Sequence, residues 1–277
     1  MNTVITGASD GIGAASALEL ARKGHQLILV GRTPSKLSAV ADQVAAITGS
    51  RPGTLTGDFT SFEDVRRLAA ELLDRCERID VLINNAGVMS TKRQHTADGH
   101  ELMIQVNHLS PFLLTNLLLD RIRESSGRVV TTCSRAAKTG RLDPADLSRE
   151  RRRWSGWLQY GDSKQANALF TVSLAERGIA ATCLHPGVIR TGFAPGTFLM
   201  KLVLHVPGMG ESVEAGAARI THLATHRDGV DHPGRYFAGN VPVTVPGQMA
   251  DPELAAALWS ASLAATGSAN DRSSASG

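Results

Sequence analysis

The chain lacks the features that mark several protein classes. Its 277 residues include three cysteines, none in a Cys-x-x-Cys pair, so we expect neither a disulfide framework nor a zinc site. The net charge of +3 is too small to indicate nucleic acid or an anionic membrane as a partner. No run of about 18 apolar residues occurs, and an apolar strand begins almost at Met1. These absences predict a cytoplasmic, reduced protein without a signal peptide or membrane span.

What the sequence does contain is a regular alternation of strand and helix patterns. This alternation predicts an α/β fold, a doubly wound parallel sheet of about seven strands with helices on both faces. We expect one domain over residues 1–266, with a substrate-loop segment at about 192–225 and a disordered tail at 267–277. Strands are predicted at 4–5, 26–30, 53–57, 80–83, 128–132, 179–184 and 235–237, and the longer helices at 102–123, 157–177 and 212–224.

A glycine-rich turn follows the first predicted strand. Residues 6–13 read Thr-Gly-Ala-Ser-Asp-Gly-Ile-Gly and lead directly into a helical run. A strand that turns through glycines into a helix places backbone N–H groups beside the positive end of a helix dipole, where phosphate binds. The plain alternative is a tight loop with no ligand. The spacing is Gly-x-x-x-Gly-x-Gly rather than the more common Gly-x-Gly-x-x-Gly.

A second polar segment, residues 84–87 (Asn-Asn-Ala-Gly), ends the fourth predicted strand. In the usual strand order of dinucleotide-binding sheets, the first and fourth strands are neighbours, and ligands bind where the order reverses. We therefore expect residues 84–87 to lie beside the glycine turn. An ordinary Asn-Gly-type turn is the alternative.

Four residues form a candidate catalytic group. Tyr160 and Lys164 lie four residues apart at the start of a predicted helix, so their side chains share one face. A nearby ammonium stabilises a phenolate, so we expect Lys164 to lower the pKa of Tyr160 toward useful proton transfer. Ser134, at the end of the fifth strand, is suited to orient a carbonyl oxygen. Asn107 is suited to hold a water or a backbone carbonyl.

These motifs, with a Pro-Gly pair at 186–187, resemble the short-chain dehydrogenase/reductase family over nearly the whole chain. The resemblance implies a single-domain Rossmann fold. Within the family, residues 155–164, 185–191, 234–237 and 253–259 are similar to the branch of retinol dehydrogenases and WW-domain oxidoreductases. No WW domain or N-terminal membrane anchor is expected.

The resemblance implies a role for each matching residue. Tyr160 would be the acid or base, Lys164 would bond the nicotinamide ribose, Ser134 would hold the substrate oxygen, and Asn107 would anchor a proton-relay water. The implied cofactor-binding residues also include Gly7, Ser9, Asp10, Gly11, Ile12, Gly13, Arg32, Asp58, Phe59, Asn85, Ala86, Gly87, Pro186, Gly187, Val188 and Thr191. No metal site is implied.

The end of the second strand indicates the cofactor. NAD-binding proteins place an acid there for the ribose 2′-hydroxyl, whereas an arginine accommodates the 2′-phosphate of NADP. This chain has Gly31-Arg32 and no acid nearby. We therefore predict NADP(H), with NAD(H) as the alternative. Asp10 opposes this prediction, because NADP-preferring relatives often carry a basic residue within the glycine turn.

The substrate is less well specified. Residues 192–210 are apolar and are interrupted by glycine and proline, which suits a lid over a lipophilic carbonyl or alcohol, a helix packed on the core, or a weak membrane contact. The arginine cluster at 149–153 is expected to be a solvated loop. The predicted activity is hydride transfer by a carbonyl reductase or alcohol dehydrogenase. A non-catalytic NAD(P)-sensing protein and an epimerase or dehydratase of the same fold are the alternatives, and monomer and homo-oligomer both remain open.

Overall fold

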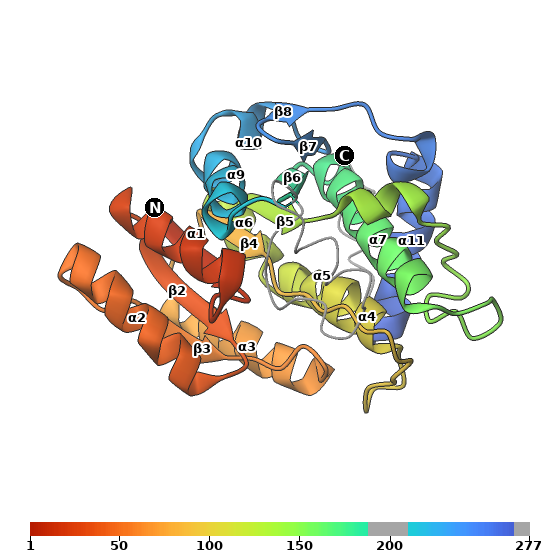
Figure 1. Cartoon of the computed structure of the whole chain (residues 1–277), viewed down its shortest axis with the longest axis horizontal. Helices are drawn as coiled ribbons and strands as arrows, with labels where there is room; N and C mark the ends of the chain where they lie inside the picture. The colour runs from red at the N-terminus through yellow and green to blue at the C-terminus, as the bar shows by residue number, and fades with distance from the viewer. Residues whose placement is uncertain (188–209, 269–277) are drawn as a thin grey trace.

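Eight strands form one sheet in the order β3-β2-β1-β4-β5-β6-β7-β8 (Figure 1). The computed structural model describes residues 1–187 and 210–268. All neighbouring strands are parallel except β7 and β8, which are antiparallel. The strands are β1 Asn2–Thr6, β2 Gln26–Gly31, β3 Gly53–Thr56, β4 Val81–Asn84, β5 Arg128–Thr132, β6 Ala180–His185, β7 Tyr236–Ala238 and β8 Val241–Pro242. The predicted α/β fold is confirmed, and the short edge strand β8 was not predicted.

Helices cover both faces of this sheet. They are α1 Gly11–Arg22, α2 Pro34–Thr48, α3 Phe62–Arg75, α4 Leu102–Ile104, α5 Ser110–Leu117, α6 Leu119–Glu124, α7 Gly156–Glu176, α9 Val213–Thr225, α10 Asp228–Asp231 and α11 Pro252–Thr266. Side-chain caps fix several starting points: Ser61 accepts from the Asp64 amide at 3.3 Å, and Asp251 accepts from the Glu253 amide at 2.9 Å.

The alternation of strand side chains divides the core into two layers. In β1, Val4 faces one layer and Ile5 the other, because successive side chains point to opposite faces of a sheet. The Val4 layer includes apolar side chains of α3, α5, α7 and α11. The Ile5 layer includes those of α1, α2 and α9. Burial on both faces explains why the central strands read as continuous apolar runs.

The prediction of one continuous helix over residues 102–123 is wrong. The segment consists of α4, a π-helical turn at Gln105–Leu109, then α5 and α6. The Ser110 amide bonds the Gln105 carbonyl, five residues back. Pro111 has no amide hydrogen to bond the carbonyl of Asn107, four residues earlier, so the regular α-helical pattern is interrupted there. π-Helical turns of this kind are frequent at functional sites, and this one contains Asn107.

The prediction that the arginine cluster at 149–153 is a solvated loop is also only partly correct. Arg149 is 5% exposed, and its Nε lies 2.8 Å from Oδ2 of Asp162, a fully buried residue of α7. Arg152 pairs with Asp146 at 3.0 Å. Arg151 and Arg153 are exposed, as expected. Asp162 lies 13 residues after Arg149 and Asp146 lies six residues before Arg152, so both acids are outside the arginine cluster itself.

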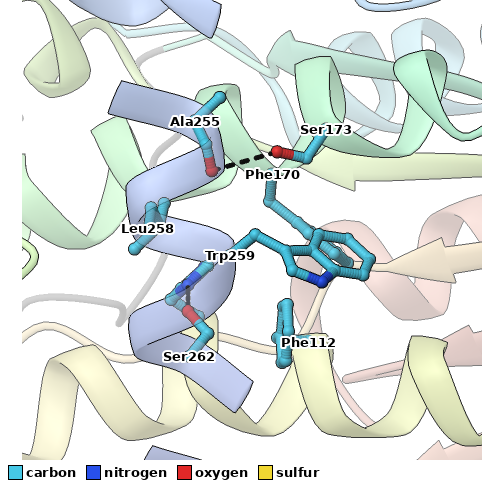
Figure 2. A pocket seen from close by; sticks show the side chains of 8 residues that line it. Phe112, Phe170, Ser173, Ala255, Leu258, Trp259 and Ser262 are labelled. Atoms are coloured by element: carbon cyan, nitrogen blue, oxygen red, sulfur yellow. Dashed lines mark hydrogen bonds between the residues drawn. The ribbon is translucent and has the colours of Figure 1, made fainter. Parts of the chain in front are cut away.

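A buried aromatic cluster joins α5 and α7 to the C-terminal helix α11 (Figure 2). Trp259 packs edge-on to Phe112, with ring centroids 5.0 Å apart, and lies 6.0 Å from Phe170. His108 is fully buried beside Phe112 and Phe170, and its Nε2 is 2.9 Å from Oγ of Ser262. Burial lowers the pKa of His108 to about 3, so this histidine is neutral in the folded protein.

Some expectations about the chain remain predictions. Within residues 1–187 and 210–268, every helix is too short or too polar to cross a bilayer. The cytoplasmic location stays a prediction. The apolar segment 198–206 and most of the predicted tail lie outside the described residues. All three cysteines are buried and free of disulfides.

The buried ion pair between Arg149 and Asp162 gives a first prediction. Arg149→Met leaves the Asp162 carboxylate without its closest cation, so the free energy of unfolding should fall by about 3 kcal/mol. The exposed Arg153→Met should change it by less than about 0.5 kcal/mol. Urea unfolding of both variants measures this. Equal stabilities of the two variants would show that the pair does not anchor the loop to α7.

His108 gives a second prediction, about acid stability. Its pKa is about 3 when folded and about 6.5 when unfolded, so the unfolded chain binds more protons between these values. Its contribution is complete above pH 6.5 and is lost as the pH falls, costing about 2 kcal/mol between pH 7 and pH 5. His108→Gln should therefore lose about 2 kcal/mol less than wild type over that range in urea unfolding. The exposed His95→Gln serves as the control, and a His108→Gln slope equal to wild type contradicts the assignment.

Candidate functional site

The glycine turn packs tightly against itself and against β4. Gly7 and Gly11 have φ values of +67° and +53°, the left-handed region that favours glycine. A Cβ atom on Gly13 would lie 2.1 Å from the Gly7 carbonyl oxygen, and one on Gly7 would lie 2.9 Å from Cα of Ala86. A side chain at Gly13 would force the start of α1 away from the turn, and one at Gly7 would force the turn away from the end of β4. The turn therefore presents bare backbone at the N-terminus of α1, the arrangement that accepts a phosphate.

Hydrogen bonds tie this turn to the end of β4. The Thr6 hydroxyl accepts from the amides of Asn85 and Ala86 at 3.0 and 3.1 Å. The Asn85 side chain donates to the carbonyls of Thr6 and Gly7 at 3.1 and 3.3 Å. The structure thus brings together two segments almost 80 residues apart, as the strand order predicted. Their contact with a cofactor stays a prediction.

The end of β2 approaches the same turn. Arg32 directly follows β2, and a Cβ on Gly31 would lie 3.1 Å from the Ser9 side chain. Asp10 caps α1 by accepting from the Gly11 amide at 2.8 Å, and its other oxygen lies 2.7 Å from Lys36 Nζ in the first turn of α2. The hydrogen bond from Lys36 lowers the pKa of Asp10. Lys36 was missed in the sequence, although its place four residues after Arg32 in a helix that starts at Pro34 was a usable signal.

The residues after β3 are held by a local contact and by a contact with the start of α5. The Asp58 side chain accepts from the amide and hydroxyl of Thr60 at 2.9 and 2.8 Å. The Phe59 side chain is buried in the core, and its carbonyl accepts from Ser110 at 2.7 Å. Asp58 therefore has an ordered side chain at the carboxyl edge. Phe59 has only its backbone to offer a ligand.

Ser134, Tyr160 and Lys164 converge at the carboxyl end of β5. Ser134 caps a short 3-10 turn at Arg135–Thr139 and forms a side-chain hydrogen bond with Tyr160. Lys164 Nζ lies 5.8 Å from the centroid of the Tyr160 ring and donates to the Thr132 carbonyl at 3.1 Å. Tyr160 and Lys164 are both nearly fully buried. The structure thus brings together three of the four predicted catalytic residues directly.

The expectation that Lys164 brings the pKa of Tyr160 below its ordinary value is wrong for the protein chain by itself. Burial raises the pKa of Tyr160 above its ordinary value, and the hydrogen bond with Ser134 only partly opposes this. Burial also lowers the pKa of Lys164 to about 8. In this structure the Lys164 ammonium donates to the Thr132 carbonyl, and desolvation is the largest effect on both groups. Tyr160 is thus a protonated phenol at neutral pH.

Asn107, the fourth predicted residue, orders the backbone beside Lys164. Its side-chain oxygen accepts from the Val88 amide at 2.7 Å, and its amide nitrogen donates to the Val88 carbonyl and to Ser163 Oγ, each at 3.0 Å. A Cβ on Gly87 would lie 3.2 Å from Asn107 Oδ1 and 3.5 Å from Lys164 Nζ. The loop after β4 therefore lies directly against the Asn107 and Lys164 side chains.

The remaining predicted positions follow β6. The Pro186 carbonyl accepts from Arg219 at 2.6 Å, and Gly187 has a φ of +109°. Arg219 forms an ion pair with Glu211. Val188 and Thr191 lie outside the described residues, so the structure is silent about their predicted roles.

An apolar surface surrounds Tyr160 and was not predicted. Met103, Ala136 and Tyr160 form a small cluster against which Val88, Met89 and Trp154 pack. Trp157, one turn before Tyr160 in α7, is 50% exposed, and its ring centroid lies 6.5 Å from that of Tyr160. In the sequence, Trp157 was part of a predicted helix and of the segment 155–164 that resembles the retinol dehydrogenase branch, with no role assigned to its side chain.

Comparison with known proteins identifies the family. Residues 1–200 match the family described as short chain dehydrogenase. The chain is 41% identical over 266 residues to the "Putative daunorubicin C-13 ketoreductase DnrU" of Streptomyces sp. (strain C5), covering 95% of this chain and 92% of that one. It is 36% identical over 272 residues to retinol dehydrogenase 13 of Homo sapiens, covering 94% and 82%.

Solved structures agree with the sequence relatives. A crystal structure of a protein from Mycobacterium paratuberculosis superposes with a TM-score of 0.78 at 35% identity, covering 96% of this chain and 93% of that one. A short chain dehydrogenase from Shigella flexneri 2a, complexed with NADP, gives a TM-score of 0.70 at 25% identity, covering 87% and 97%. The chain therefore belongs to the short-chain dehydrogenase family, as an oxidoreductase related to retinol dehydrogenases.

Proposed function

We propose that the protein transfers hydride between NADP(H) and a carbonyl or alcohol group of a lipophilic small molecule, with Tyr160 as the acid or base. The observation that carries the proposal is the convergence of Ser134, Tyr160 and Lys164 at the sheet edge that also holds the glycine turn. The nicotinamide, when bound, supplies or accepts the hydride. The protein orients both reactants and manages the proton.

The proposed proton transfer follows from the state of Tyr160. Since the phenol is protonated at neutral pH, it is ready to donate its proton to a carbonyl oxygen as that oxygen gains negative charge. Ser134, already hydrogen-bonded to Tyr160, would hold the same oxygen. The buried Lys164 ammonium favours the phenolate that the transfer leaves behind. We also propose that the Lys164 ammonium donates a hydrogen bond to a ribose hydroxyl of the cofactor next to Gly87.

The cofactor proposal rests on two cations. Arg32 follows β2, where the adenosine ribose is expected, and guanidinium pairs strongly with phosphate. Lys36 already neutralises Asp10, the one acid that opposed a 2′-phosphate. The Shigella relative was solved with NADP, which supports the same cofactor here.

The substrate proposal rests on the surroundings of Tyr160. Val88, Met89 and Trp154 pack against the cluster that contains Tyr160, and the ring centroid of Trp157 lies 6.5 Å from that of Tyr160. The names of the relatives refer to a ketone and to retinol. A lipophilic ketone, aldehyde or alcohol matches both observations.

Tyr160→Phe tests the acid. Loss of the hydroxyl should lower kcat at least about 1000-fold, while the Kd for NADPH, read by fluorescence titration, stays within about threefold. The chain has one other tyrosine, Tyr236, which is also buried, so Tyr236→Phe is a matched control and should keep kcat near wild type. Unchanged turnover in Tyr160→Phe would remove Tyr160 from its proposed role.

Arg32→Ala tests the cofactor. Because a charge-assisted hydrogen bond contributes about 1.5–3 kcal/mol, kcat/KM with NADPH should fall about 10- to 100-fold and that with NADH should hardly change. Lys36→Ala should show the same selectivity to a smaller degree, since Lys36 also pairs with Asp10. Lys23→Ala, at the far end of α1, is the control. A wild-type preference for NADH contradicts the proposal.

A further inference from the structure

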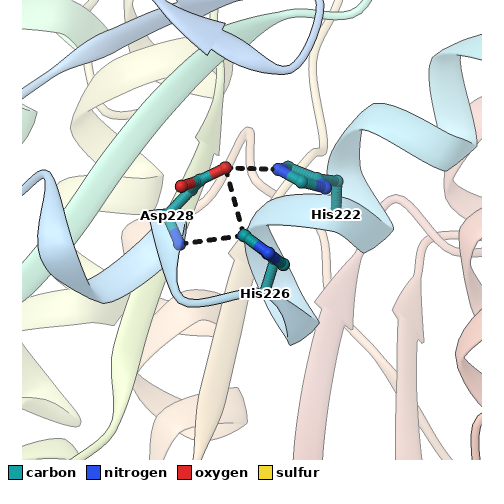
Figure 3. A group of neighbouring side chains, drawn as sticks. All are labelled: His222, His226 and Asp228. Atoms are coloured by element: carbon teal, nitrogen blue, oxygen red, sulfur yellow. Dashed lines mark hydrogen bonds and ion pairs between the residues drawn. The ribbon is translucent and has the colours of Figure 1, made fainter.

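A cluster of two histidines and an aspartate, residue types that commonly bind metal ions, lies at the junction of α9 and α10 (Figure 3). His222 is in the last turn of α9, His226 caps that helix, and Asp228 begins α10. One ligand atom from each of these three residues lies within 4.8 Å of the other two. A third histidine, His232, places Nε2 3.9 Å from Oδ1 of Asp228.

We propose that these residues form a site for a divalent transition-metal ion of the zinc class. Imidazole nitrogens with one carboxylate suit Zn²⁺, Co²⁺ and Ni²⁺, whereas Ca²⁺ and Mg²⁺ require mostly oxygen ligands. The ion would be held by His222 Nε2, His226 Nδ1 and one Asp228 oxygen, with His232 or water in the fourth position. This site does not depend on the proposed hydride transfer.

The distances are close to those that such an ion requires. Oδ2 of Asp228 lies 2.7 Å from His222 Nε2 and 3.1 Å from His226 Nδ1. Ligand atoms about 2.0–2.1 Å from a tetrahedral zinc lie about 3.4 Å from one another. Binding therefore needs small outward movements of side chains that are partly or largely exposed. It exchanges the hydrogen bonds of the cluster for metal–ligand bonds.

The backbone beneath the cluster is held firmly. Arg128 Nη1 donates to the carbonyls of Leu223 and His226 at 3.2 and 2.7 Å. A Cβ on Gly229 would lie 2.0 Å from the Leu223 carbonyl oxygen, so α10 packs directly against the end of α9. The rings of His222 and His226 are stacked, with centroids 4.6 Å apart and planes 18° apart. The ligands are thus positioned before any ion binds.

The site is remote from the candidate active site. Arg128, which anchors it, is the first residue of β5, and Ser134 follows six residues later beyond the opposite end of that strand. At about 3.3 Å per residue, the two ends are roughly 20 Å apart. The proposed ion therefore stabilises the α9–α10 junction and takes no part in hydride transfer.

The test uses full-length, untagged protein dialysed against EDTA and titrated with ZnCl₂ in a calorimeter at neutral pH. Wild type should bind one ion per chain, and saturating zinc should raise Tm by at least about 4 °C. His226→Ala and Asp228→Asn should each weaken binding at least about tenfold, since even losing a hydrogen-bond partner of a ligand costs about 10- to 100-fold. His95→Ala removes an exposed histidine paired with Glu150 elsewhere and should bind like wild type.

Three outcomes would overturn the proposal. The first is that wild type takes up no zinc. The second is that wild type, His226→Ala and Asp228→Asn bind zinc with equal affinity. The third is that wild type binds Ca²⁺ more tightly than Zn²⁺. Circular dichroism of the two ligand variants without metal verifies that each is folded before its affinity is compared.

Discussion

The site depends on a close contact between the glycine turn and the end of β4, in which no side chain fits. Gly7 and Gly13 pack against each other and against Asn85 and Ala86, with the Thr6 hydroxyl bonding both of those amides. This contact fixes the spacing of β1, β4 and the start of α1. The same edge then receives α7 with Tyr160 and Lys164. A single methyl group at Gly13 would separate the elements that the chemistry needs together.

The second constraint is the desolvation of Tyr160 and Lys164. Burial raises the pKa of the phenol and lowers the pKa of the ammonium, because desolvation favours the uncharged form of each group over its charged form. A buried ammonium with one carbonyl partner, Thr132, is well suited to accept further hydrogen-bond partners. Bound ribose hydroxyls would supply them. The proposed acid is thus protonated in the free protein and needs its charge partner only after it gives up its proton.

Much of the fold followed from local patterns in the sequence. Apolar strands and the glycine turn each depend on neighbours in the chain, so these elements were predictable. Topology then placed residues 84–87 beside the turn. The π-helical turn around Asn107 was not predictable from helix periodicity, although Pro111 marked its position. The burial of Arg149 depends on Asp162, and the pairing of Asp10 depends on Lys36, and both are contacts between different elements.

The surface around Tyr160 was hidden for a similar reason. Val88, Met89, Trp154 and Trp157 come from separate loops and a helix end, and no spacing rule links them. Their convergence beside a buried phenol supports the proposal of a lipophilic substrate. The histidine cluster at the α9–α10 junction differs, because His222, His226 and Asp228 lie close together in the sequence, at the end of α9 and the start of α10.

The central claim is that this sheet edge moves hydride between NADP(H) and a carbonyl carbon. The most direct measurement is to incubate the protein with NADPH carrying deuterium at nicotinamide C4 and a panel of lipophilic aldehydes and ketones, and to analyse the products by mass spectrometry. The account predicts an alcohol with one deuterium on the former carbonyl carbon, formed in step with NADPH consumption. NADPH that binds but is not consumed above the enzyme-free rate with any substrate of the panel would contradict it.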